Sequence, residues 1–232
     1  MDIAELHFKA PQTTAYHRPT PSPSKPLTMI PAPFTIYPAT TPHHLSQIHT
    51  LFTAYATSLG HDLSFQSFAT ELSTLPGAYS PPDGRLFLAL SPDSTALGCV
   101  GLRPLPTSAS APFSSSSANE PTNSSAGESS DRSAGSPVGK TAEMKRLYVV
   151  PSARGTGLGK ALALAAIRAA RDEGYSAVKL DTLREMKAAR SMYEGLGFRE
   201  CGQYYETPLE GTVFMELDLR DWGEGEGGEE EV

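Results

Sequence analysis

The sequence predicts an α/β (α+β) fold in which a central, mixed and twisted β-sheet carries helices on both faces. Segments with strand and helix patterns alternate along the chain in the order βααββ and then βαβαββ. A glycine-rich turn at residues 154–160 also joins an apolar strand pattern to a long alanine-rich helix pattern, a connection typical of sheets with flanking helices. These two observations place one domain at residues 34–220.

The chain begins with a proline-rich leader, residues 1–33, in which runs such as Pro19-Thr20-Pro21-Ser22-Pro23 suit neither a helix nor a central strand. We expect this leader to be disordered. After it, Thr41 supplies a capping oxygen and Pro42 fits the first turn of a helix that continues to Gly60. The elements expected in this half are a strand at 34–37, helices at 41–60 and 64–75, and strands at 85–90 and 96–103.

Residues 104–140 are dominated by Ser, Pro, Ala and Gly, so little there offsets the entropy of ordering. We expect a disordered insertion between two strands that would otherwise be hairpin neighbours. The elements expected after it are a strand at 143–150, a helix at 157–173, a strand at 176–183, a helix at 187–196, and strands at 198–205 and 213–219. The acidic residues 221–232 come last, and we expect them to form a disordered tail.

Composition excludes several classes of function. Six carboxylates lie in the tail, so the formal net charge of −7 leaves the rest of the chain near −1 (−7 less −6), with no basic stripe for nucleic acid. The two cysteines, Cys99 and Cys201, lack the spacing of a zinc site or a disulfide framework. No apolar run approaches the ~18 residues of a transmembrane helix, and no secretory signal pattern is present. We therefore expect a cytoplasmic or nuclear protein without metal, nucleic-acid or membrane partners.

The segment Arg154–Lys160 has the features of a phosphate-binding loop. It opens a helix, whose first N–H groups lack intrahelical partners and whose dipole favours an anion, and its glycines let the backbone approach that anion. A Walker loop requires four residues between its first glycine and Gly-Lys, but here only three separate Gly155 from Gly159, and Ala161 replaces the Ser or Thr that should follow. A dinucleotide fingerprint requires a third glycine where Lys160 stands. The pattern that remains is Arg-x-x-Gly-x-Gly.

This pattern, with the strand Glu143–Val150 before it and the Gly195–Phe198 turn after it, resembles the acyl-CoA site of the GNAT N-acetyltransferase superfamily. The resemblance covers most of residues 34–220 and is specific over 142–219. It implies a splayed strand pair whose second strand starts near Ser176, with the pantetheine arm lying against exposed backbone groups. The residues that it assigns to the cofactor are Leu147, Tyr148, Val149, Arg154, Gly155, Thr156, Gly157, Leu158, Gly159 and Lys160. It also implies that the Val149 N–H meets the oxyanion of the transition state.

Tyr193 stands where related proteins place a tyrosine that protonates the departing thiolate. The alternative is an aromatic side chain that packs under the loop. Met186 stands where many relatives carry Asn, a departure that removes a side-chain contact with the cofactor but leaves the backbone site in place.

Glu143 stands where some members of the superfamily carry a general base, which matters because an ammonium must lose a proton before its nitrogen can attack. If alternation along the strand is unbroken, Glu143 shares one face with Lys145, Leu147 and Val149. The alternative role of Glu143 is a carboxylate that pairs with a neighbouring Lys or Arg.

The acceptor side of the site is less well defined by the sequence. Phe65, Tyr204 and Tyr205 are candidates to line it, and Asp62 and Gln66 are weaker candidates of the same kind. For the two tyrosines, the alternative is a strand aromatic pair in the core.

We therefore predict an acetyl-CoA-dependent N-acetyltransferase that moves an acetyl group to a primary amine by direct attack, with Tyr193 as the general acid. The expected partner is a small-molecule or peptide amine, with a small or amino-acid-like acceptor preferred, and the expected state is a monomer or homodimer. The alternatives are a catalytically silent CoA-binding or sensing module and a protein lysine or N-terminal acetyltransferase. In a third interpretation, the insertion and the tail are docking segments and the domain is a scaffold.

Overall fold

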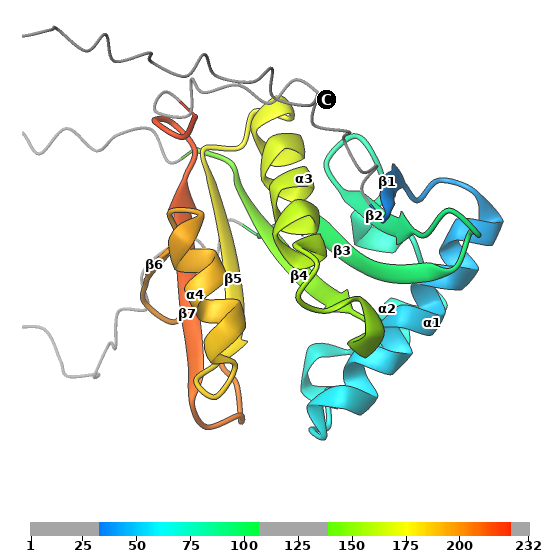
Figure 1. Ribbon diagram of the computed structural model, residues 1–232. Helices are drawn as coiled ribbons and strands as arrows, with labels where there is room; N and C mark the ends of the chain where they lie inside the picture. The colour runs from blue at the N-terminus through cyan, green and yellow to red at the C-terminus, as the bar shows by residue number, and fades with distance from the viewer. Residues whose placement is uncertain (1–32, 107–138, 224–232) are drawn as a thin grey trace, which may run out of the picture. The chain divides into compact units, whose positions relative to one another are not determined.

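A central sheet of seven strands organises residues 33–106 and 139–223, the residues that the computed structural model describes. The strand order is β1-β2-β3-β4-β5-β7-β6, and every neighbouring pair is antiparallel except β4 and β5, which are parallel (Figure 1). The strands are β1 (Thr35–Pro38), β2 (Arg85–Leu90), β3 (Ala96–Pro104), β4 (Thr141–Val149), β5 (Ala177–Leu183), β6 (Arg199–Glu200) and β7 (Thr212–Asp218). The predicted leader except Pro33, most of the insertion (107–138) and most of the tail (224–232) lie outside the described residues.

Helices cover both faces of the sheet, as the sequence predicts. They are α1 (Pro42–Leu59), α2 (Phe68–Ser73), α3 (Leu158–Asp172) and α4 (Lys187–Gly195), with short 3₁₀ turns η1 (Ser64–Gln66), η2 (Gly77–Tyr79) and η4 (Pro151–Ala153). The alternating side chains of β2 show the two faces directly. Leu86 and Leu88 pack into the core beneath α1, whereas Phe87 and Ala89 pack into the core beneath α3. Each fully buried Leu or Phe contributes about 1.5–3 kcal/mol, so both layers stabilise the sheet.

Two predicted elements differ from the structure. The helix predicted at 64–75 is broken at Ser67, whose φ of 55° is left-handed, and only residues 68–73 form α-helix. Asp62 favours the preceding turn, because its carboxylate accepts hydrogen bonds from the N–H and the hydroxyl of Ser64. The strand predicted at 198–205 shortens to two residues, since the chain then turns so that Tyr204 and Tyr205 pack edge-on against Phe214.

The N-termini of α1 and α3 are capped differently. Thr41 caps α1 as predicted, with its hydroxyl accepting a hydrogen bond from the His44 N–H at 3.1 Å. The N-cap residue of α3 is Gly157 in the left-handed region, at φ 85°, and it supplies no side-chain cap. The first N–H groups of α3 therefore remain available to an external anion.

Strands β4 and β5 pair over only three residues and then diverge (Figure 1). The paired positions are Thr141 with Ala177, Ala142 with Val178, and Glu143 with Lys179. Beyond Glu143, the edge of β4 that faces β5 has no strand partner among residues 33–106 and 139–223. This is the splayed pair that the sequence predicts.

A β-bulge interrupts β4 where this divergence begins. Lys145 lies opposite Gly101 and Tyr148 lies opposite Cys99, so two residues of β4, Arg146 and Leu147, share the space opposite one residue of β3. Arg146 adopts a left-handed φ of 58°. The expectation of unbroken alternation is therefore wrong. Leu147 and Val149 pack towards the α3 side, whereas Glu143 and Lys145 lie with the polar groups of the α1 side.

Strands β3 and β4 are hairpin neighbours, as predicted for the strands on either side of the insertion. Pro104 is paired with Ala142, and the Leu105 N–H donates to the Thr141 carbonyl at 2.9 Å. The chain thus leaves β3 and enters β4 at adjacent points.

Candidate active site

An open groove of about 580 Å³ runs between the second half of β4, the glycine loop and α4. Its residues come from the far end of α1, from β4, from the loop and from the start of α4. They are Tyr55, Ser58, Leu59, Leu147, Tyr148, Val149, Ala153, Arg154, Gly155, Gly159, Glu185, Met186, Lys187, Ala188, Ala189 and Met192. The groove therefore lies along the unpaired edge of β4.

The backbone of β4 presents hydrogen-bonding groups to this groove. The Val150 N–H donates to the Leu97 carbonyl at 2.9 Å, so Val150 points its N–H towards β3. Because successive residues of an antiparallel ladder alternate in direction, the Val149 N–H points away from β3, towards the open edge. The Val149 carbonyl accepts from Arg154 Nε at 3.1 Å, which ties the loop to the strand. An extended amide-containing arm can pair with such an edge as an added strand does.

The glycine loop has the geometry of an anion site. Gly155 and Gly157 have φ values of 78° and 85°, a conformation in which a side chain is strained, although a Cβ at either position would meet no atom within 4 Å. The exposed side chain of Lys160 adds positive charge in the first turn of α3, while the buried Leu158 anchors that turn in the core. These residues fit a pyrophosphate, because free helix N–H groups and a cation surround one accessible point.

Six of the ten cofactor residues predicted from the sequence line the groove together: Leu147, Tyr148, Val149, Arg154, Gly155 and Gly159. The other four belong to the same loop and helix start without lining the groove. Among them, the Thr156 hydroxyl donates to the Ala153 carbonyl at 2.8 Å, so it holds the loop in shape.

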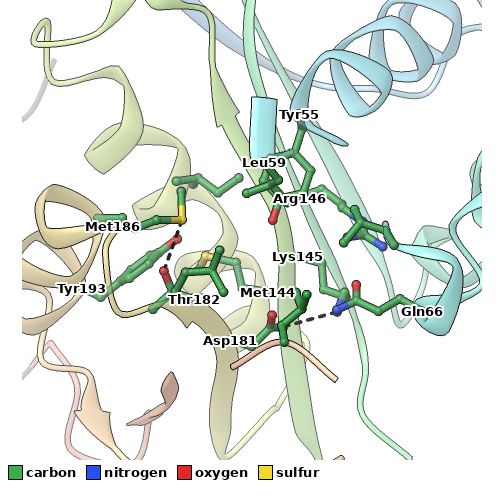
Figure 2. Close-up of a pocket in the computed structure, with 15 residues that line it drawn as sticks. Tyr55, Leu59, Gln66, Met144, Lys145, Arg146, Asp181, Thr182, Met186 and Tyr193 are labelled. Carbon is green, nitrogen blue, oxygen red and sulfur yellow. Dashed lines mark hydrogen bonds and ion pairs between the residues drawn. The ribbon is translucent and has the colours of Figure 1, made fainter. Parts of the chain in front are cut away.

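A narrow cavity of about 50 Å³ continues from the groove between β4 and β5 (Figure 2). Five residues line both spaces, namely Tyr55, Leu59, Leu147, Met186 and Ala189. Tyr193 and Met186 enter the cavity from α4 and its first turn, and Lys145, Asp181 and Gln66 line it from β4, β5 and η1 (Figure 2). A chain lying in the groove would therefore end at this cavity.

Tyr193 is buried at 6% exposure, and its ring packs edge-on against Phe198. Burial raises the pKa of Tyr193 well above its usual value, and the proximity of Tyr55 and Asp181 raises it further. The phenol therefore keeps its proton at neutral pH. A protonated phenol that lines the cavity is suited to donate to a developing thiolate.

Glu143 lies deeper in the structure and does not line the cavity. Its side chain is 2% exposed, and it is ion-paired with Arg103 at 2.7 Å and with Lys145 at 3.4 Å. The Tyr204 hydroxyl also donates to it at 3.2 Å. Burial alone would raise the pKa of Glu143, but Lys145 and Arg103 hold it below its usual range. These contacts favour the alternative role as a paired carboxylate, and general-base action by Glu143 remains a prediction.

Of the acceptor residues predicted from the sequence, Gln66 lines the cavity, whereas Phe65, Tyr204 and Tyr205 do not. Phe65 lies in η1, Tyr204 is buried in a small cluster with Leu105 and Phe214, and Tyr205 accepts a hydrogen bond from Gln66 Nε2 at 3.1 Å. Burial raises the pKa of Tyr205, and the nearby Asp181 carboxylate raises it further.

Three cavity residues were missed or given little weight at the sequence level. Asp181, on β5, is ion-paired with Lys145 at 3.4 Å, and Gln66 comes from the distant turn η1. Tyr55, in the last turns of α1, lines both spaces, and burial followed by the charge of Asp181 raises its pKa to about 12. The strand pattern marked position 181 as one of alternating exposure, but nothing in the sequence places it against residues more than 100 positions away.

Comparisons with known proteins point to one family. The model of the Acetyltransferase (GNAT) family matches residues 45–198. An uncharacterized N-acetyltransferase of Schizosaccharomyces pombe is 31% identical over 191 residues, which cover 82% of this chain and 98% of that protein. An uncharacterized N-acetyltransferase of Dictyostelium discoideum is 36% identical over 206 residues, covering 76% of this chain and 95% of that protein.

A solved structure agrees with the fold. The crystal structure of an acetyltransferase of the GNAT family from Staphylococcus aureus superimposes with a TM-score of 0.56 at 16% identity, covering 81% of this chain and 99% of that one. Within the part of this chain that the structure describes, no helix combines the length and the apolar character needed to cross a membrane.

Proposed function

The chain belongs to the GNAT acetyltransferase family, and from that premise we propose that it transfers an acetyl group from acetyl-CoA to the nitrogen of a small primary amine. The family implies N-acetyltransferase activity with an acyl-CoA co-substrate and an amine acceptor. The observation that carries the proposal is the continuous path from the glycine loop, along the open edge of β4, to the cavity in which Tyr193 lies.

The groove supports binding of the donor in three parts. The loop and the start of α3 receive the pyrophosphate, and the backbone of Leu147 pairs with the pantetheine arm. The thioester then lies at the junction of groove and cavity, beside Tyr55 and Leu147. The Val149 N–H, which points towards the open edge, donates to the thioester oxygen as negative charge develops on it.

The proposed reaction is direct attack. The ammonium of the acceptor loses a proton, its nitrogen forms a bond to the thioester carbon and releases a second proton to solvent, and the C–S bond breaks. The departing thiolate takes a proton from Tyr193, which is then reprotonated from solvent. The products are an N-acetylamine, free CoA thiol and one proton.

Calorimetric titration tests the donor site. We expect acetyl-CoA to bind and S-acetylpantetheine, which lacks the pyrophosphate and the nucleotide, to bind at least about tenfold more weakly, because it loses the charge-assisted bonds to the loop. Equal affinity for the two would remove the loop from the proposal. An absence of heat with acetyl-CoA at high micromolar protein would contradict the donor assignment itself.

Release of free thiol from acetyl-CoA, followed across a panel of amines, tests transfer. We expect acetylation of at least one small primary amine, identified by mass spectrometry as a gain of one acetyl group. A protein that binds acetyl-CoA but acetylates no amine or peptide in the panel would instead support the silent CoA-binding module.

A further inference from the structure

We propose that Asp181 and Gln66 bind the amine nitrogen of the acceptor, and that the acceptor is a primary amine on an apolar skeleton without a carboxylate beside that nitrogen. This inference rests on the proposed function, in which the acceptor reaches the narrow cavity at the end of the groove. Both residues line that cavity (Figure 2).

Asp181 is the carboxylate best able to accept a further hydrogen bond in a network of three acids and three bases. The acids are Glu71, Glu143 and Asp181, and the bases are Arg103, Lys145 and Arg146. Glu143 is contacted by Arg103 at 2.7 Å as well as by Lys145, and it is 2% exposed. Glu71 accepts from Arg146 at 3.0 and 2.6 Å, and it is 9% exposed. Asp181 meets one cation, Lys145, at the longer distance of 3.4 Å, and its side chain is 21% exposed. Of the three carboxylates, only Asp181 lines the cavity.

Gln66 adds a second acceptor to the same cavity. Its Oε1 atom is buried and has no hydrogen-bond partner among the described residues. Its Nε2 atom donates to the Tyr205 hydroxyl at 3.1 Å, which fixes the orientation of the amide. A buried acceptor without a donor costs about 1–3 kcal/mol, and an amine nitrogen, rich in N–H groups, would remove that cost.

The cations of the cavity argue against a carboxylate on the acceptor. Lys145 and Arg146 are the two basic residues that line it, and their side chains are 4% and 2% exposed. Arg146 is held by the two bonds to Glu71, and Lys145 lies between Glu143 and Asp181. Both cations are already paired with carboxylates of the protein, so an α-carboxylate would compete with those partners for them.

Most of the other lining side chains are apolar. Leu59, Leu63, Leu183 and Leu209 come from α1, the turn after it, β5 and the β6–β7 connection. The cavity, at about 50 Å³, is narrow, so these leucines would contact the carbons next to the amine nitrogen. The chemistry fits an alkylamine or arylalkylamine better than an amino acid.

The test compares phenethylamine with phenylalanine, which share a skeleton and differ by one carboxylate. With acetyl-CoA saturating, we expect the wild-type protein to acetylate phenethylamine with a kcat/KM at least about tenfold above that for phenylalanine. Asp181→Asn should raise the KM for phenethylamine about tenfold or more, since a hydrogen bond to a charged group contributes at least that factor. The KM for acetyl-CoA should stay within about twofold. Gln66→Leu should raise the amine KM by a smaller factor.

Asp172→Asn is the matched control, because Asp172 is an exposed carboxylate at the end of α3, and it should change neither KM. Acetyl-CoA binding by calorimetry checks that each variant is folded, and Gln66→Leu decides the matter if Asp181→Asn does not fold. Equal turnover of the two acceptors, or an unchanged amine KM in both variants, would overturn the inference while leaving the proposed function intact. Failure to bind acetyl-CoA or to acetylate any amine would instead count against the proposed function.

Discussion

The two halves of β4 have the same backbone conformation and opposite surroundings. Over residues 141–143 the strand is paired on both edges. The side chains of Glu143 and, just beyond it, Lys145 form part of a buried network of ion pairs. Over residues 147–149 it is paired only with β3, and its other edge lines the groove. We refer to these as the closed half and the open half of β4.

The boundary between the halves is the bulge at Arg146. A left-handed φ is unfavourable for an arginine, so other contacts must hold it. The guanidinium donates to both oxygens of Glu71, lies 5.1 Å from the Phe68 ring, and the Tyr79 hydroxyl donates to Glu71 at 2.6 Å. One strand thus changes from a paired strand of the sheet to the wall of a groove because Glu71 of α2 holds its extra residue, Arg146; we call this contact the clamp.

The largest expected effect is at Tyr193 of α4, which lines the cavity that continues from the groove of the open half. Tyr193→Phe removes the proposed proton donor and should lower kcat by about 10²–10⁴-fold with an unchanged KM for acetyl-CoA. Steady-state kinetics of thiol release measures both. Tyr175→Phe is the control, because the Tyr175 hydroxyl donates to the Asp83 carbonyl away from the cavity, and it should leave kcat unchanged. A Tyr193→Phe enzyme with full kcat would show that the thiolate obtains its proton elsewhere.

Removing the Arg146 side chain at the boundary should cause a large loss of stability. Arg146→Ala leaves the Glu71 carboxylate buried without its cation, so we expect a loss of about 3–5 kcal/mol in the free energy of unfolding. Denaturant unfolding measures this loss. Arg190→Ala breaks an ion pair with the exposed Glu200 and should cost at most about 1 kcal/mol. Similar losses in the two variants would show that the bulge does not depend on the clamp.

The closed half should respond through stability and pH. Because the folded-state pKa of Glu143 is lowered, its ionised form stabilises the fold above the unfolded pKa of about 4.3, and that contribution is lost as pH falls through the folded pKa. Glu143→Gln should therefore be less stable than the wild type at pH 7, with the difference shrinking towards pH 3. Unfolding curves at several pH values give this difference. A large fall in kcat in a well-folded Glu143→Gln variant would instead support the role of Glu143 as general base.

The smallest effect should come from the loop that continues the open half. Gly157→Ala forces a side chain into a left-handed φ, which costs about 1 kcal/mol, and disturbs the helix start that receives the pyrophosphate. We expect a several-fold higher KM for acetyl-CoA.

Gly174→Ala provides the matched control for this change. Gly174 has a φ of 74° at the other end of α3, and a Cβ there also meets nothing within 4 Å. It should lose the same stability without a change in KM. If both variants raised the KM alike, the effect of Gly157→Ala would come from strain alone.

Local patterns were sufficient to predict most of the fold and the position of the glycine loop. The alternation of helices and strands, the Thr41 cap and the Arg154–Lys160 loop each depend on residues close in sequence, and the structure contains all three. The bulge at Arg146 could not be predicted, because no glycine or proline marks it and its stabilising partner Glu71 is distant in sequence.

The sequence could not predict the narrow cavity for a similar reason. Asp181 and Gln66 have ordinary local contexts, and only the packing of η1 against the splayed strands brings them into one cavity. The break at Ser67 has a local cause instead, since a short Asx turn competes with a helical pattern that looks continuous.

The hairpin contact between β3 and β4 has a practical consequence. Leu105 and Thr141 are held together by a backbone hydrogen bond, at the end of β4 opposite the glycine loop. Two attachment points one strand spacing apart, about 4.8 Å, place no tension on whatever is tethered between them. A fluorescent reporter or an affinity module could therefore be inserted into the chain at this position. Because the position is distant from the groove, we expect the insertion to leave the groove unchanged.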